Sequence, residues 1–234
     1  LGNASGADAL TLSFSDTTVS AAALLALNDK TSVALNAVNV TTVTGTATDV
    51  AALYTAGGQG TITNLGNEAV TLTDASVTVA QANAVAATTT GGVTATLVET
   101  TLSALSGLAE SNNHYSVTIT ETAIDAAALK GLNDKTDVVI TINGATSVSG
   151  TQANVLSVLS SSGVTGWSNP TVTLTDAVTV AQAAAIAGLT ANVVTATVQD
   201  TVSNLLGLEA GNAFAMKVTD GTLNAANLNS LDGR

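Results

Sequence analysis

The sequence predicts an α/β fold: a right-handed parallel solenoid of about nine prism-like coils, each with a strand, a short strand and a helix. One observation is repetition, since Val-Thr-Leu-Thr-Asp-Ala at residues 70–75 returns at 172–177, and Leu-Asn-Asp-Lys-Thr at 27–31 returns at 132–136. The other is composition, because hydrophobic residues make up 46% of the chain but aromatic residues only 2%. A fixed period with few large side chains indicates stacked units rather than one globular core.

Nine segments alternate apolar residues with Thr or other polar residues, which is the pattern of a half-buried strand. Seven of them end at an acidic residue and two do not. They are residues 10–16, 33–37, 70–74, 93–99, 117–121, 138–142, 172–176, 194–200 and 214–220. Because the chain reaches each new strand through a helix, we expect parallel strands joined by right-handed crossovers.

A link and an Ala/Leu-rich helix follow each strand. The links at residues 40–43, 76–79, 147–149 and 178–180 predict the short second strand. A polar residue directly before an Ala/Leu run predicts a helix N-cap. The expected N-caps are Ser20, Ser103, Asp125, Ser203 and Asn224. The apolar face of each helix is expected to form the core.

The repeats predict a single solenoid domain over residues 1–234. We expect long repeats of four coils at approximately 9–114 and 115–213, and a partial long repeat at 214–234. Two longer links, residues 59–67 and 163–169, are predicted to protrude as loops. Leu1 and Arg234 are interpreted as cut points within a longer chain.

Charge and cysteine content exclude several classes of function. With 5 basic and 17 acidic residues and a formal charge of −12, the chain is not expected to bind nucleic acid or anionic lipid. It has no cysteine, which excludes disulfides and thiolate metal sites. No run of 18 apolar residues occurs, so membrane insertion is not expected.

The motif Val-Thr-Leu-Thr-Asp-Ala followed by Val-Ala-Gln-Ala, together with Leu-Asn-Asp-Lys-Thr, resembles the tandem Thr/Ala-rich repeats of giant secreted and cell-surface proteins of cyanobacteria and other aquatic bacteria. The resemblance implies an extracellular or cell-surface location and a structural or adhesive role. The outline of the coil is also similar to leucine-rich repeats. Their motif Leu-x-x-Leu-x-Leu-x-x-Asn is absent, so their binding properties are not transferred.

The leading hypothesis is therefore a structural segment that serves as an extended scaffold or adhesin stalk. Its partners would be neighbouring repeats of the same chain and, by end-to-end association, further copies. The alternative is a binding module for glycan, calcium or a surface, using the concave Thr-rich sheet face or the longer loops. No enzyme and no cofactor other than calcium are expected, because no catalytic set can be built around His114, the single histidine, which we expect at a coil corner.

A column of seven acidic residues is the strongest candidate site. Stacked carboxylates repel one another, and calcium would relieve that repulsion. The alternative is that each acid ends a strand in a local turn and accepts a backbone N–H near the helix start. The column comprises Asp16, Asp74, Glu99, Glu121, Asp176, Asp200 and Asp220.

Two weaker candidates remain. Trp167, in the longer link at 163–169, either stacks on a sugar or covers the apolar edge of that link. The Thr-x-Thr pairs at 71/73, 94/96, 118/120, 173/175 and 195/197 either order water for ice binding or form an ordinary solvated sheet face. Asn36 and Lys217 interrupt these rows, which favours the solvated face.

Overall fold

The computed structural model describes residues 8–109 and 113–232; Leu1, Arg234 and residues 110–112 of the first predicted long repeat lie outside the described residues. The chain divides into two compact units. The first unit comprises Leu1–Glu99, Gly107–Val117 and Asp134–Val138, and the second comprises Thr100–Ser106, Thr118–Asn133 and Val139–Arg234. The pairing of strands and helices is described within each unit.

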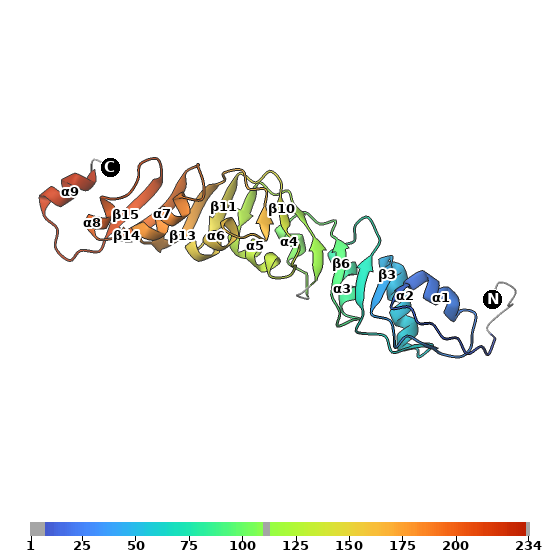
Figure 1. The fold of residues 1–234 in the computed structure, drawn as a ribbon. Helices are drawn as coiled ribbons and strands as arrows, with labels where there is room; N and C mark the ends of the chain where they lie inside the picture. Colours follow the sequence, from blue (N-terminus) through green and yellow to red (C-terminus); the bar gives the residue numbers. More distant parts are fainter. Residues whose placement is uncertain (1–7, 110–112, 233–234) are drawn as a thin grey trace. The chain divides into compact units, whose positions relative to one another are not determined.

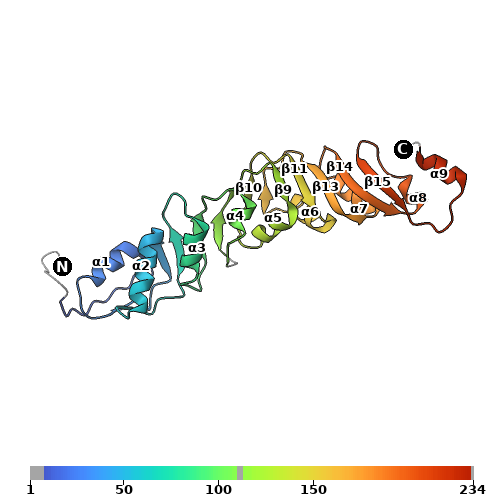
Figure 2. The same cartoon turned by 180° about the vertical axis from the view of Figure 1, so that it is seen from behind.

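Parallel strands and one row of helices build the first unit. Its larger sheet has the order β1-β3-β5-β6-β7, and a smaller sheet pairs β2 with β4. Helices α1, α2 and α3 follow one another beside these strands (Figure 2). The elements are β1 (Thr18–Ser20), α1 (Ala21–Asn28), β2 (Leu35–Asn36), β3 (Thr42–Gly45), α2 (Ala47–Gly58), β4 (Ile62–Thr63), β5 (Ala69–Leu72), α3 (Val79–Ala86), β6 (Val93–Thr96) and β7 (His114–Ser116).

The second unit repeats this arrangement. Its larger sheet has the order β15-β14-β13-β11-β9, its smaller sheet has the order β12-β10-β8, and α5, α6 and α7 lie in a row beside them (Figure 1). The elements are α4 (Leu102–Leu105), β8 (Thr118–Ile119), β9 (Ala123–Asp125), α5 (Ala126–Asn133), β10 (Ile140–Ile142), β11 (Ser147–Gly150), α6 (Gln152–Leu159), β12 (Val164–Thr165), β13 (Thr171–Val178), α7 (Val180–Ala187), β14 (Val194–Asp200), α8 (Val202–Leu205), β15 (Ala213–Val218) and α9 (Ala225–Asp232).

The predicted α/β class with parallel strands is confirmed, and the strand register explains why small side chains suffice. Alternate residues of neighbouring strands stack in register, so equivalent apolar side chains form buried columns. In the second unit, Ile124, Val148, Val172 and Val194 form one such column and are at most 1% exposed. Among the described residues, no helix is both long enough and apolar enough to cross a membrane.

The helix starts confirm three of the predicted N-caps and correct two. Ser20, Asp125 and Asn224 each accept an N–H from the third residue of the helix that follows. Ser103 and Ser203 are not N-caps. Helices α4 and α8 begin two residues earlier than predicted, at Leu102 and Val202, and Thr101 and Thr201 cap them instead.

Strand placement also differs from the prediction. Residues 33–37 and 138–142 do not extend the larger sheets, because β2 and β10 within them belong to the smaller sheets. No named strand forms over residues 10–16; the first is β1. The smaller sheets also receive β8 from the predicted strand at 117–121, which Glu121 follows, so an acidic residue after a strand does not mark which sheet the strand joins.

The longer links do not protrude as predicted. Residues 59–67 contain β4, in which Ile62 pairs with Leu35, and residues 163–169 contain β12, in which Val164 pairs with Ile140. Ile62 is fully buried and Val164 is 6% exposed. Burial of these apolar side chains draws both links into the smaller sheets.

Candidate functional site

Six of the seven column acids bind the start of a helix. Each carboxylate accepts a hydrogen bond from the backbone N–H of the first residue in the helix that precedes it along the chain. The acceptors and donors are Asp74 and Ala47 (2.7 Å), Glu99 and Val79 (2.9 Å), Glu121 and Leu102 (2.9 Å), Asp176 and Gln152 (2.8 Å), Asp200 and Val180 (3.1 Å), and Asp220 and Val202 (2.7 Å).

The turn alternative is therefore right about the donor type but wrong about its location. The N–H belongs to the preceding helix, 18 to 27 residues earlier, and Asp200 alone of the six also accepts an N–H recorded in its own turn, that of Thr201. In α2, for example, the Thr46 side chain accepts the N–H of Asp49 while Asp74 accepts that of Ala47. These N–H groups have no partner within the helix, and the helix dipole favours a negative charge there.

Asp200 shows the electrostatic consequence. Its carboxylate accepts hydrogen bonds from the Asn204 side chain at 2.7 Å and from the backbone N–H groups of Thr201 and Val180. These donors stabilise the charged form, so they lower the pKa of Asp200, with Asn204 making the largest contribution.

Asp16 is the seventh member of the column. It precedes Leu27 by the same spacing as Glu121 precedes Leu132, so the two acids are equivalent in the long repeat. Its side chain is exposed beside a groove of about 240 Å³ that is lined by Phe14, Val19 and Leu24, among others.

The column spreads its carboxylates along the sheets. Within the part of the chain that the structure describes, no three His, Asp or Glu side chains lie close enough to hold a metal ion. The calcium alternative stays a prediction.

A second set of contacts between successive strand–helix passages was not predicted. The hydroxyl groups of Thr31, Thr89, Thr136 and Thr190 each donate to a main-chain carbonyl 20 or 21 residues earlier. The same hydroxyl oxygen accepts the N–H two residues later. Thr31 and Thr136 end the repeated motif Leu-Asn-Asp-Lys-Thr, which is the signal that could have revealed this role.

Four of the five Thr-x-Thr pairs lie exposed on or next to strands of the larger sheets, whereas Thr118 lies in β8 of a smaller sheet. Thr44, Thr71 and Thr94 stand in register on successive strands, and the next residue in the row is His114. His114 lies in β7 and not at a corner as predicted, and its Nδ1 is 2.6 Å from Asp137 Oδ1. In the second unit the row of Thr173 and Thr195 continues to Ala213, so both rows are short.

Trp167 is half-buried just after β12, following Gly166 with a φ of 89°. Its indole Nε1 is buried without a hydrogen-bond partner among the described residues. The half-buried ring agrees with a covering role, while sugar stacking stays a prediction.

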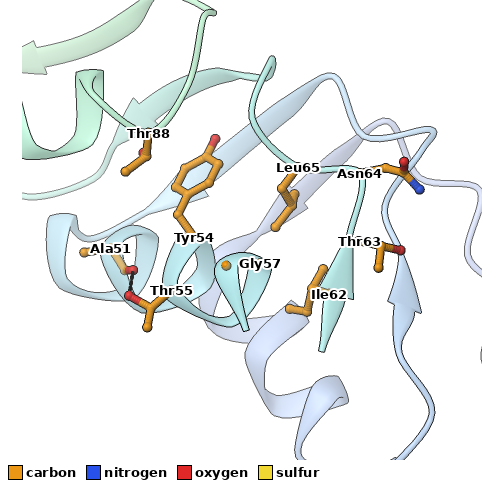
Figure 3. Close-up of a pocket in the computed structure, with 10 residues that line it drawn as sticks. Ala51, Tyr54, Thr55, Gly57, Ile62, Thr63, Asn64, Leu65 and Thr88 are labelled. Carbon is orange, nitrogen blue, oxygen red and sulfur yellow. Dashed lines mark hydrogen bonds between the residues drawn. The ribbon is translucent and has the colours of Figure 1, made fainter. Parts of the chain in front are cut away.

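A groove of about 690 Å³ lies between α2 and residues 62–65 of the first unit (Figure 3). Tyr54 and Leu65 form apolar walls, and Gly57 and Gly58 leave space at the end of the helix. This groove borders the predicted binding loop at 59–67, although sequence reasoning did not identify Tyr54 as part of it.

A buried carboxyl group holds Tyr54 in place. The Tyr54 hydroxyl donates to Glu68 Oε2 at 2.9 Å, and the Gly66 N–H donates to the same oxygen at 2.8 Å. Glu68 is fully buried, and its Oε1 has no hydrogen-bond partner among the described residues. Burial and then the charge of Glu68 raise the pKa of Tyr54, which keeps its hydroxyl a donor.

Comparisons with protein-family models, curated proteins and solved structures give no match to this chain.

Proposed function

We propose that the chain is a structural repeat segment: a right-handed parallel solenoid of nine strand–short strand–helix coils that serves as an extended scaffold or adhesin stalk. The observation that carries this proposal is the carboxylate column. Each of six acids joins one coil to the helix start of the coil before it. Stability built from contacts between neighbouring coils is typical of repeat scaffolds.

The second support is the threonine contact described above. Thr31, Thr89, Thr136 and Thr190 bridge successive coils at buried or half-buried positions. The threonine bonds and the carboxylate column both use side chains that recur with the repeat. Many polar residues of the chain therefore hold neighbouring coils together. We propose no catalytic role.

A secreted or cell-surface location belongs to the same proposal. It is supported by the resemblance to giant bacterial surface proteins and by the absence of cysteine from a Thr-rich, acidic chain. Labelling of intact producing cells with a membrane-impermeant reagent tests the location, and protection of the chain in intact cells would contradict it.

Thiol cross-linking tests the stacking directly, since the natural chain offers no competing cysteine. Thr44 and Thr71 are in register on neighbouring strands, about 4.8 Å apart. We expect the double variant Thr44→Cys/Thr71→Cys to be linked by dibromobimane, which fluoresces when it joins two thiols.

Thr44→Cys/Thr94→Cys is the matched control, because these residues lie two strands apart in the same row. It should react far more slowly. Equal cross-linking of both pairs, or of neither, would refute the stacked register and with it the scaffold proposal.

A binding module is the second candidate, and the groove beside Tyr54 is the specific observation that favours it. The groove combines apolar walls with hydroxyl and amide oxygens, as small-molecule sites do. It lies in the part of the first long repeat where α2 extends beyond the length of α6, which is its equivalent in the second long repeat.

A further inference from the structure

The threonine hydroxyls that line the Tyr54 groove have already used their hydrogen-bond donors. The hydroxyls of Thr55, Thr63 and Thr88 donate to backbone carbonyls at 2.8, 3.1 and 2.7 Å. The Asn64 amide donates to Asn36 Oδ1 at 2.8 Å. Each of these side chains keeps oxygen lone pairs. The three hydroxyls therefore present acceptors, and a ligand must bring the donors for them.

Glu68 adds negative charge directly behind the groove. It lies against the hydroxyl of Tyr54, whose ring lines the groove (Figure 3). Its main chain is fixed as well, because the Thr89 hydroxyl donates to its carbonyl oxygen at 2.6 Å. The described residues form no ion pair with Glu68. A buried carboxylate without a cationic partner is costly, so it calls for an explanation.

The second long repeat shows that the fold does not need this pair. Thr46 and Thr151 cap equivalent helices, which makes Leu159 the equivalent of Tyr54. Ile62 and Val164 occupy equivalent pairs in the smaller sheets, which makes Pro170 the equivalent of Glu68. The same supporting strands thus form with two apolar residues in place of the hydrogen-bonded pair. A local departure from the repeat that costs stability points to a role outside folding.

We propose that the Tyr54 groove binds a small organic cation, an alkylammonium group whose chain packs on Leu65 and whose charge lies over the Tyr54 ring. The ring face attracts cations, and the Glu68 carboxylate strengthens the attraction from behind. The ammonium N–H groups supply the donors that the hydroxyl oxygens of Thr55, Thr63 and Thr88 lack. This inference rests on the binding-module candidate and is independent of the scaffold proposal.

Titration of the full chain with butylammonium chloride tests the proposal, and NMR chemical shifts of the groove residues report the binding. Butanol and sodium butyrate serve as the neutral and anionic probes of the same length. We expect saturable binding of butylammonium, at least roughly tenfold weaker binding of butanol, and no binding of butyrate. Equal binding of butylammonium and butanol, or no butylammonium binding at the groove, overturns the proposal.

Two variants locate the effect. Glu68→Gln removes the charge at constant size and should weaken butylammonium binding roughly tenfold while leaving butanol unchanged. Gly58→Leu places a side chain into the groove one helical turn after Tyr54 and leaves Glu68 unchanged, and it should weaken both ligands.

Gly131→Leu is the matched control for Gly58→Leu, because both glycines are helical and a Cβ at either position meets no atom within 4 Å. It should bind butylammonium as the natural chain does. If Glu68→Gln fails to fold, Gly58→Leu still decides: unchanged butylammonium binding in that variant places the cation elsewhere and overturns the proposal. The thiol cross-linking experiment described above tests the scaffold proposal independently of this binding experiment.

Discussion

Asp200 couples the stability of this chain to pH at the scale of a single side chain. Its carboxylate holds the start of α7 through Val180 and the start of its own helix through Thr201 and Asn204. Because these donors lower its pKa in the folded chain, the stabilisation is present above the unfolded value of about 3.9 and is lost as the pH falls through the lower folded value.

We therefore expect Asp200→Asn to melt at a lower temperature than the natural chain at pH 7. The difference between the two melting temperatures should shrink below about pH 4, where the natural carboxyl group also becomes neutral. Thermal unfolding followed by circular dichroism between pH 2 and 8 measures it. Asp29→Asn, at an exposed corner outside the column, serves as the control with the same charge change and should show no such pH dependence.

The members of the column could be predicted from the sequence, but their partners could not. Alignment on the acidic residue after each strand finds Asp74 and Asp176, because the repeat keeps them at the same place. The N–H that each one accepts lies 27 or 24 residues earlier, and it meets the acid only through the packing of strands and helices. Tyr54 and Glu68 left no periodic signal, since the second long repeat replaces them with Leu159 and Pro170.

At the scale of the elements, glycine at the end of a strand allows close approach to the first residue of the preceding helix. A Cβ at Gly45 would lie 3.0 Å from the Ala21 Cβ, and a Cβ at Gly150 would lie 3.0 Å from the Ala126 Cβ. Strands β3 and β11 thus end in glycine, and the helices α1 and α5 pack against them.

Replacement of these glycines by alanine separates steric contact from backbone strain. Gly45→Ala should cost about 1 kcal/mol through contact alone. Gly150→Ala should cost at least about 2 kcal/mol, because its φ of 155° is also unfavourable for a side chain. Urea unfolding of both variants checks this order, and a larger loss for Gly45→Ala would contradict it.

Element boundaries show why sequence patterns assigned the right class and misplaced some strands. Alternation identifies residues 33–37 and 138–142 as strands, but it does not say which sheet receives them. The links at 59–67 and 163–169 look like loops because Ile62 and Val164 are isolated apolar residues among Gly, Asn and Ser. Pairing with Leu35 and Ile140, which is distant in sequence, makes them strands.

At the scale of the whole molecule, we propose that copies associate end to end through the exposed face at β1. Asp16 is equivalent to Glu121, which accepts the first N–H of α4. Helix α9 presents a start that no column acid binds among the described residues. Asp16 of one copy and the start of α9 in the next are therefore complementary in charge.

Sedimentation equilibrium should show association that increases with protein concentration. Asp16→Lys should weaken it by about tenfold, because a positive charge repels the helix start. Asp29→Lys makes the same charge change at the opposite end of α1 and should associate normally. A folded chain that stays monomeric at every concentration would rule out the association.

The alternation of acids and glycine at helix starts also sets the unit by which such a protein can change its length. In the proposed long repeat of four coils, three coils present a carboxylate and the coil of Gly45 or Gly150 presents none, so each helix start suits one kind of neighbour. Unequal recombination that adds or removes a complete long repeat, such as residues 28–132, preserves every match. A gain or loss of a single coil leaves a mismatched helix start. We therefore expect the lengths of related genes to differ by multiples of four coils.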